Sequence, residues 1–355
     1  MDKYNIDSHK LVYHVDRVNE WLKGKNIYPI YAEISPKGAC NHRCVFCGLD
    51  FMEYKPRYLE REILEKRIFE MGSLGLKSVM YAGEGEPLLH KEIGDIILFT
   101  KKADIDAALT TNGVLLNKEL IDKTLGSIEW IKISINAGTK ETYSKIHRTK
   151  PNDFDRVFEN MRYAVKVRSE NGYKTALGMQ LLLLPDNWHE AELLAQKAKD
   201  TGLDYLVIKP YSQHLLSKIT AYKNVKYNDY LHLSDKLEKF NDDKFNVIFR
   251  MNTMNKWDEG KHEYEQCLAL PFWSYIDAGG NVWGCSCYLN DERFYYGNIN
   301  DESFEAIWNG ENRKKSLEFV NIELNTSQCR VNCRMDKINK YLWNLKHPVE
   351  HVNFI

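Results

Sequence analysis

The sequence predicts an α/β fold in which short parallel strands alternate with helices. Six apolar runs rich in Ile, Val and Leu are separated by segments whose apolar residues recur every three or four positions. Repeated strand–helix units favour parallel strands with right-handed crossovers, hence a barrel or an open doubly wound sheet. Polar, glycine-containing loops follow several strands, as active-site loops do at the C-terminal face of α/β barrels.

The individual elements follow from these patterns in chain order. The expected strands cover residues 30–34, 78–81, 106–110, 130–135, 176–184 and 205–208. Helical apolar spacing falls within 59–71, 93–97, 154–165 and 191–198. After residue 208 the pattern changes to a polar stretch with one expected helix near 230–240. We therefore predict three regions: an N-terminal extension (1–28), the strand–helix domain (29–225), and a linker helix with a small C-terminal domain (226–355).

Composition limits the class of protein and its location. The chain has 355 residues, a hydrophobic fraction of 43%, a charged fraction of 28% and a net charge of −1. These values describe an ordinary soluble globular protein, and the charge argues against binding nucleic acid. The N-terminus lacks the apolar core of a signal peptide, and no apolar run is long enough to cross a membrane. Eight cysteines without a signal peptide predict a cytoplasmic metalloprotein without disulfides.

Three cysteines in one loop carry the strongest functional signal. Cys40, Cys44 and Cys47 directly follow the first expected strand. Three thiolates can hold three irons of a cubane cluster and leave the fourth iron open for a ligand. The alternative is zinc, which in structural sites usually takes four ligands in two pairs. No further cysteine occurs until Cys267, and His42 lies inside the loop with awkward geometry for the same ion.

The spacing C-x3-C-x2-C, with Phe46 before the last cysteine, resembles the radical S-adenosylmethionine (radical SAM) enzymes. The resemblance implies a partial (β/α)6 TIM-like barrel with a catalytic [4Fe–4S] cluster. It implies that the open iron chelates S-adenosylmethionine, which is cleaved reductively to a 5′-deoxyadenosyl radical that abstracts hydrogen from the substrate. A one-electron donor such as flavodoxin or ferredoxin is then an expected partner.

Further residues match positions where this family binds its cosubstrate. The run at 81–89 resembles the Gly-Gly-Glu-Pro motif that holds the methionyl amine, although Glu84 replaces the first glycine. The matching residues are Gly85, Glu86 and Pro87. Asn112, in a Thr-Asn-Gly turn, resembles the family's equivalent turn, and the same sequence is also a sound ordinary turn. Phe46 is expected on the adenine, with plain loop packing as the alternative.

The inner face of the predicted barrel supplies the rest of the cofactor set. Because side chains alternate along a strand, Lys132, Ser134 and Asn136 should face the lumen while three isoleucines face the helices. Ser134 and Asn136 then resemble the polar residues that bind the ribose hydroxyls, with a solvated strand end as the alternative. Gln180 and Lys209, on the fifth and sixth strands, complete this set.

A second cysteine group lies near the C-terminus. It resembles the SPASM/twitch extension of radical SAM enzymes, including a Gly-x4-Cys entry at 280–285 and a Gly-Asn-Ile…Ile-Trp run at 297–308. The expected ligands of one auxiliary [4Fe–4S] cluster are Cys267, Cys285, Cys329 and Cys333, and zinc with the same four ligands is the alternative. Cys287 is left over, as a spare thiol, a ligand in place of Cys285, or a hydrogen-atom donor.

The reaction is predicted from this layout. Fewer than thirty residues precede the first strand, too few for a leader-peptide-binding domain, which favours a small-molecule substrate. A single auxiliary cluster resembles 2-deoxy-scyllo-inosamine dehydrogenase, so we expect oxidation of a carbinol in a sugar, aminocyclitol or nucleotide-sugar. Such an oxidation needs a base, for which Tyr211, His214 and Arg250 are candidates. The alternatives are an epimerase with Cys287 as donor, a peptide-modifying maturase, and a non-catalytic metal-binding scaffold.

Overall fold

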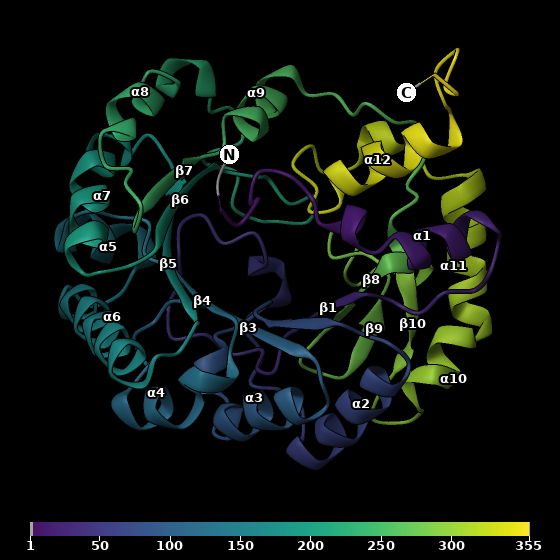
Figure 1. Ribbon diagram of the computed structural model, residues 1–355, viewed down its shortest axis with the longest axis horizontal. Coiled ribbons are helices and arrows are strands. Elements are labelled where there is room, and N and C mark those ends of the chain that lie inside the picture. The colour runs from purple at the N-terminus through teal and green to yellow at the C-terminus, as the bar shows by residue number, and fades with distance from the viewer. Residues whose placement is uncertain (1–2, 355) are drawn as a thin grey trace.

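The computed structural model describes residues 3–354, in which ten strands form one continuous sheet lining the inside of a ring of helices (Figure 1). The strand order is β10-β9-β8-β1-β2-β3-β4-β5-β6-β7. Strands β1 to β7 run parallel, β8 is parallel to β1, and β9 and β10 are antiparallel additions. The barrel strands are β1 (Tyr31–Ile34), β2 (Ser78–Tyr81), β3 (Asp106–Thr111), β4 (Trp130–Ser134), β5 (Ala176–Leu183), β6 (Tyr205–Pro210) and β7 (Asn246–Phe249). All six predicted strands are confirmed, and β7 is a seventh.

The crossover helices cover the outer face of the sheet (Figure 1). They are α2 (Arg61–Ser73), α3 (Ile93–Lys102), α4 (Lys118–Thr124), α5 (Lys140–His147), α6 (Asn152–Asn171) and α7 (Ala191–Asp200). The four predicted helical segments are confirmed as α2, α3, α6 and α7. Helices α4 and α5 have seven and eight residues, too few for a clear apolar period. Each helix begins at a side-chain cap. The Asn117 side chain accepts a hydrogen bond from the Leu120 amide, and the Thr139 side chain accepts one from the Thr142 amide.

Strand β4 shows why the inner and outer faces differ. Ile131 and Ile133 are buried against the helices, whereas Lys132 and Ser134 are partly exposed on the inner face. The alternation predicted from the sequence is therefore confirmed.

The N-terminal segment enters the barrel at the end where the strands begin. The Tyr4 ring lies 5.3 Å from the ring of Tyr205, the first residue of β6, and Ile6 packs in the same apolar cluster. In Figure 1 this part of the chain crosses the interior beside β6 and β7. The chain then continues through α1 (Val15–Leu22), whose Val18 packs with Phe272 and Leu342 from the C-terminal part of the chain.

The sheet continues past residue 225, the predicted domain boundary. Beyond it lie α8 (Leu233–Glu238), which is the helix predicted near 230–240, then β7 and α9 (Met251–Glu259). The C-terminal elements are β8 (Trp273–Ile276), β9 (Asn281–Trp283), β10 (Tyr295–Asn298), α10 (Phe304–Asn309), α11 (Glu311–Ile322) and α12 (Asp336–Lys346). Strand β8 pairs with β1, matching Tyr31 to Trp273. The boundary near residue 225 stays a prediction, since hydrogen-bonded strands continue on both sides of it.

A tight turn joins β8 to β9, as the Gly-Gly-Asn signal at 279–281 predicts. Gly280 adopts a φ of +87°, a conformation that favours glycine. Among residues 3–354, no helix combines the length and the apolar character needed to cross a bilayer.

Candidate active site and auxiliary metal centre

The three cysteines of the first loop follow β1 at the C-terminal end of the barrel strands. Burial is the main cause that raises their thiol pKa values, to about 12 for Cys40 and well above the ordinary value for Cys44. Burial likewise raises the pKa of Cys47, against a hydrogen bond from Tyr54. Soft thiolates are suitable ligands for an iron–sulfur cluster, and these three must lose their protons when a metal binds.

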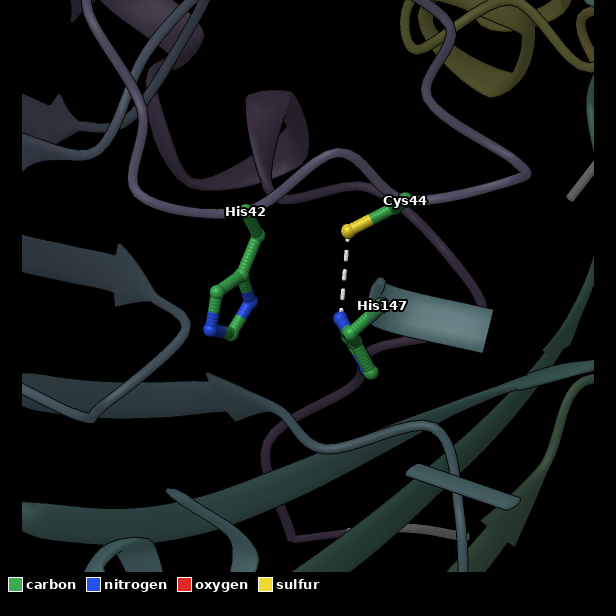
Figure 2. A group of neighbouring side chains, drawn as sticks. All are labelled: His42, Cys44 and His147. Carbon is green, nitrogen blue, oxygen red and sulfur yellow. Dashed lines mark hydrogen bonds between the residues drawn. The ribbon is translucent and has the colours of Figure 1, made fainter. Parts of the chain in front are cut away.

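Cys44 lies against a histidine that the sequence analysis did not single out. Its Sγ is 3.1 Å from Nδ1 of His147 at the end of α5 (Figure 2). Nε2 of the same ring lies 3.0 Å from the Ile135 carbonyl. A proton on Nε2 donated to that carbonyl leaves Nδ1 to accept from the thiol. His147 is more than a hundred residues from Cys44, so no local motif could have revealed the contact.

His42 offers an alternative metal site beside the same cysteine. One ligand atom each from His42, Cys44 and His147 lie within 4.8 Å of one another (Figure 2). Neither ring nitrogen of His42 has a hydrogen-bond partner in the described part of the chain, and Nε2 lies 4.0 Å from Asp153. Such a zinc site would leave Cys40 and Cys47 unused, whereas a cluster held by three cysteines uses all the thiols of the loop.

The glycine-rich loop after β2 packs directly on the cysteine loop. A Cβ on Gly85 would lie 2.1 Å from the Lys37 carbonyl oxygen and 2.5 Å from that of Ala39, so only glycine fits there. The next amide, of Glu86, donates to the Ala39 carbonyl over 2.9 Å. The predicted cosubstrate loop is therefore held next to Cys40.

The Glu86 carboxylate joins the loop after β2 to the turn after β3. It accepts hydrogen bonds from the amide of Leu88, from the amide of Asn112 over 2.8 Å, and from the Thr111 hydroxyl. Burial raises the pKa of Glu86, and these three donors oppose that shift. Asn112 in turn donates from Nδ2 to Asn41 Oδ1 over 2.7 Å, inside the cysteine loop. In the structure, Glu86 and Asn112 thus position the two loops relative to each other, together with Pro87, which begins a 3-10 turn.

The inner-face residues differ in what they offer a ligand. Asn136 adopts a φ of +53°, and its Oδ1 accepts from the Leu182 amide over 2.7 Å. Its Nδ2 is buried without a partner among residues 3–354, which leaves one free donor. Ser134 is partly exposed and Gln180 buried on the same inner face.

Phe46 and the three base candidates are engaged with the protein itself. The Phe46 ring meets the His147 ring edge-on at 5.3 Å, and its contact with the adenine stays a prediction. Both ring nitrogens of His214 contact backbone, the Ser286 carbonyl at 3.0 Å and the Leu216 amide at 3.1 Å, so this ring connects segments rather than offering a free base. Arg250 donates to Asp7 and, as a guanidinium, stays a cation. The buried Tyr211 hydroxyl donates to Gln213 over 2.9 Å, and burial raises its pKa.

Five cysteines gather in the C-terminal region. One pocket is lined by the four expected ligands and by Cys287: Cys267, Cys285, Cys287, Cys329 and Cys333. The thiol of Cys287 hydrogen-bonds those of Cys285 and Cys333. The surplus cysteine therefore lies within the group rather than apart from it. Tyr288 adds a hydroxyl 3.2 Å from Cys329 Sγ, a contact the sequence analysis missed.

Side chains tie this centre to the barrel. The amide of Ala278 in the β8–β9 turn donates to Glu84 over 2.8 Å, and Arg57 pairs with the same carboxylate at 2.8 Å. Arg334, next to Cys333, pairs with Glu33 on the inner face of β1 at 2.8 Å. Glu84, the residue that departs from the family's glycine, therefore connects the loop after β2 to the C-terminal elements.

Comparisons with known proteins agree with this arrangement. Residues 34–198 match the model of the radical SAM superfamily, and residues 267–334 match the SPASM model, described as an iron–sulfur cluster-binding domain. The "Probable GTP 3′,8-cyclase" of Saccharolobus solfataricus is 34% identical over 131 residues, covering 36% of this chain and 41% of that protein. The "GTP 3′,8-cyclase" of Clostridium acetobutylicum is 33% identical over 148 residues, covering 41% of this chain and 45% of that protein. The match thus spans less than half of each curated relative.

Two solved structures show the fold at low sequence identity. Streptococcus suis SuiB bound to S-adenosylmethionine superposes with a TM-score of 0.64 at 16% identity, over 84% of this chain and 70% of SuiB. The anSMEcpe structure with bound AdoMet gives 0.59 at 17% identity, over 92% of this chain and all of that one. The two domains imply a catalytic [4Fe–4S] cluster, S-adenosylmethionine and auxiliary iron–sulfur binding, and the thiol-rich sites described above fit these groups. The chain therefore carries a radical SAM domain with the TIM-like partial-barrel fold, followed by a SPASM iron–sulfur cluster-binding domain.

Proposed function

We propose that this protein is a radical SAM enzyme whose catalytic cluster is held by Cys40, Cys44 and Cys47 and whose one auxiliary cluster is held within the C-terminal cysteine group. The observation that carries the proposal is the joint packing of the cysteine loop, the Gly85–Pro87 loop and the Asn112 turn at one end of the barrel. This packing supports a bound cosubstrate between the cysteines and the lumen.

The chain's own residues would position the cosubstrate before any chemistry occurs. The close approach of Gly85 to the cysteine loop keeps backbone carbonyls within reach of an ammonium group. Asn136 Nδ2 and Ser134 supply polar groups on the inner face, where ribose hydroxyls can bind. Bound S-adenosylmethionine would supply a 5′-deoxyadenosyl radical as hydrogen-atom acceptor, and an auxiliary cluster held by the C-terminal cysteines would supply an acceptor for one electron.

For the reaction we propose oxidation of a carbinol in a sugar, aminocyclitol or nucleotide-sugar. The substrate then loses one C–H hydrogen atom, one hydroxyl proton and one further electron. The position of Arg334 supports an electron path, because its neighbour Cys333 lines the auxiliary pocket while its guanidinium reaches Glu33 inside the barrel. Of the predicted bases, Tyr211 donates its proton to Gln213 and His214 contacts backbone through both ring nitrogens. Either residue would have to give up such a contact to accept the hydroxyl proton. Similarity to 2-deoxy-scyllo-inosamine dehydrogenase itself stays a prediction.

A second candidate is the rearrangement of a purine nucleotide. It is favoured by the 33–34% identity to proteins named GTP 3′,8-cyclase. Epimerisation with Cys287 as hydrogen donor is the third reaction to test. The fold shared with SuiB and anSMEcpe leaves a peptide substrate as a further outcome of the same assay. We place the protein in a reducing cytoplasm, with flavodoxin or ferredoxin as electron donor.

Anaerobic reconstitution with iron and sulfide, followed by addition of S-adenosylmethionine and a reductant, tests the proposal. We expect a brown protein that forms 5′-deoxyadenosine, and a candidate substrate should accelerate this formation. A product lighter by two hydrogen atoms, in equal amount to 5′-deoxyadenosine, supports carbinol oxidation. A product of unchanged mass rules it out, and a colourless zinc protein without cleavage activity shows a scaffold instead.

A further inference from the structure

The interior of the barrel has an apolar floor at the end where the strands begin. Two clusters of inward-facing residues build this floor. They comprise Tyr4, Ile6, Tyr31, Met80, Ala82, Ala108, Trp130, Ala176, Tyr205, Val207 and Ile248. The residues of this floor are mostly large and apolar, so this end of the barrel interior offers little to a charged ligand.

The next inward position on three strands is a cation. Because inward side chains recur every second residue, Lys132 follows Trp130 on β4, Lys209 follows Val207 on β6, and Arg250 follows Ile248 at the end of β7. A fourth cation, Arg334, enters the same layer from the C-terminal domain. We call these four residues the lumen cations.

The lumen cations have too few carboxylates to neutralise them. Glu33 pairs with Arg334, and Asp7 pairs with Arg250 at 3.0 Å. Lys132 and Lys209 have neither a hydrogen bond nor an ion pair with any residue between 3 and 354; the Lys132 ammonium lies only over the Trp130 ring, at 5.3 Å. The protein therefore supplies neither lysine with a hydrogen-bonding or ion-pairing partner among the residues that the structure describes.

The electrostatics of the two lysines agree with this geometry. Burial, followed by the charges of Arg334 and Arg250, lowers the pKa of Lys132 to about 8. Burial, followed by Lys132 and Arg250, lowers the pKa of Lys209 well below its ordinary value. An anion between the two ammonium groups would relieve both effects.

The lumen cations also keep exposed surface. Arg334 contacts the Tyr31 hydroxyl at 2.8 Å and Glu33 on the inner face of β1, yet its side chain is 42% exposed. Lys132 and Lys209 are likewise partly exposed although they point into the barrel. The charged ends of these inward-pointing side chains therefore keep surface that an anion can contact.

We propose that Lys132, Lys209, Arg250 and Arg334 bind the phosphate or diphosphate group of a small-molecule substrate inside the barrel. Lys132 precedes Ser134 by one inward position, so the anion would lie one layer below the residues expected to bind the cosubstrate ribose. A phosphate-bearing substrate would thereby be anchored at the floor, with its carbon skeleton directed toward the cysteine loop. The inference rests on the proposed function only in treating the bound anion as part of the substrate.

Anion binding is measured directly, without turnover. We would titrate inorganic phosphate, and separately pyrophosphate, into the cluster-loaded protein saturated with S-adenosylmethionine, anaerobically and at low salt, by calorimetry. We expect saturable binding that weakens with added salt. Lys132→Met and Lys209→Met should each weaken it by about tenfold or more, and Lys132→Arg should keep most of it. Tighter binding of pyrophosphate than of phosphate indicates a diphosphate ester, and the reverse a monophosphate.

Lys166→Met is the matched control, because Lys166 is an exposed lysine on α6 paired with Glu170. It should bind both anions like the parent. Absence of binding to the parent, equal binding by the parent and both lysine variants, or an equal loss in the control would each overturn the proposal. So would loss of S-adenosylmethionine affinity in the lysine variants, because the lysines would then serve the cosubstrate carboxylate. Cleavage of S-adenosylmethionine is scored separately, so failure of anion binding leaves the radical SAM assignment intact.

Discussion

At the scale of single residues, the cysteine loop illustrates how burial controls metal loading. Cys40, Cys44 and Cys47 all have raised pKa values, chiefly because they are buried, so the metal-free loop holds neutral thiols. Binding iron must expel these protons. His147 can accept a hydrogen bond from the Cys44 thiol, because its Nδ1 lies 3.1 Å from Cys44 Sγ. Burial lowers the pKa of His147 to about 3, so the proton passes on to solvent rather than staying on this ring.

The first prediction separates the two metal sites. Replacing Cys40, Cys44 and Cys47 together with Ala should abolish 5′-deoxyadenosine formation, because the open iron is lost. The variant should keep about four irons, those of the auxiliary cluster. Iron and zinc analysis of reconstituted parent and variant provides the check. Retained cleavage, or loss of all iron, would contradict the assignment, and zinc retained only by the parent would favour the His42–Cys44–His147 site.

The second prediction concerns Cys287, which lies among the auxiliary cysteines. If it is a hydrogen-atom donor, product made in deuterated buffer should carry deuterium at the reacting carbon in the parent but not in Cys287→Ala. Our oxidation proposal predicts no such deuterium and unchanged turnover in the variant. Iron content serves as the control, since a fall in iron would show that Cys287 is a ligand in place of Cys285.

Residues that act within one loop could be predicted from the sequence, and residues that meet across the fold could not. The three cysteines and Gly85–Pro87 form contiguous motifs, and the structure brings them together. His147 and Tyr288 contact cysteines from other elements, so their roles depend on tertiary packing. Conversely, His214 was a candidate base by position, and only the structure shows that backbone groups occupy both its nitrogens.

At the scale of elements, the loop after β2 is connected to the β8–β9 turn by one buried carboxylate. Glu84 is only 3% exposed and accepts from both Arg57 and the Ala278 amide. Burial raises its pKa, and Arg57 opposes that shift. Removing Glu84 leaves the buried Ala278 amide without its acceptor and leaves Arg57 with Asp277, 3.7 Å away, as its ion-pair partner.

The third prediction follows from that connection. Glu84→Ala should lower the free energy of unfolding by about 2 kcal/mol, because the buried Ala278 amide loses its acceptor and Arg57 loses the nearer of its two carboxylates. Its affinity for S-adenosylmethionine should stay close to that of the parent, since Gly85 and Glu86 keep their own contacts. Thermal unfolding and equilibrium binding provide the two measurements. Glu65→Ala, on the exposed face of α2, is the matched control and should change stability by less than about 0.5 kcal/mol. An equally stable Glu84→Ala protein would refute the connection.

The long elements could be predicted because their apolar residues recur with a clear period, whereas the short elements show no such period. The buried strand β5 and the twenty-residue helix α6 have clear patterns. Strand β7 has four residues after a polar stretch, and its role depends on pairing with β6. The pairing of β8 with β1 could not be predicted either, because the two strands lie about 240 residues apart in the chain and no local pattern encodes their contact.

At the scale of the whole molecule, the cations inside the barrel lower the stability of the unliganded fold while providing the proposed site for an anion. The lowered pKa of Lys132, about 8 against an ordinary 10.5, means that the folded protein holds this proton less tightly than the unfolded chain. The charged lysine therefore destabilises the unliganded fold below pH 8. Between pH 8 and about 10.5 the folded state releases the proton first, so the penalty declines as pH rises.

The fourth prediction tests whether the charge of Lys132 lowers the stability of the unliganded protein. Without phosphate, Lys132→Met should melt at a higher temperature than the parent at pH 7, because a desolvated cation among like charges is removed. The advantage should shrink as pH rises from 8 toward 10.5. Differential scanning calorimetry at several pH values follows both effects, with Lys166→Met as a control of unchanged melting temperature. A less stable Lys132→Met protein at pH 7, or a gap that widens with pH, would contradict it.

The pairing of β1 with β8 has a consequence for biosynthesis. Strand β1 leads into the cysteine loop, and one of its two neighbours is made only when the ribosome has passed residue 276. Until then β1 is an unpaired strand edge on the nascent chain, where it is open to association with other chains. Contacts this distant in sequence form slowly. Because β8 is translated late, the sheet beside the cysteine loop is completed among the last events in folding. Iron that arrives earlier would encounter a cysteine loop whose supporting strands are not yet all paired.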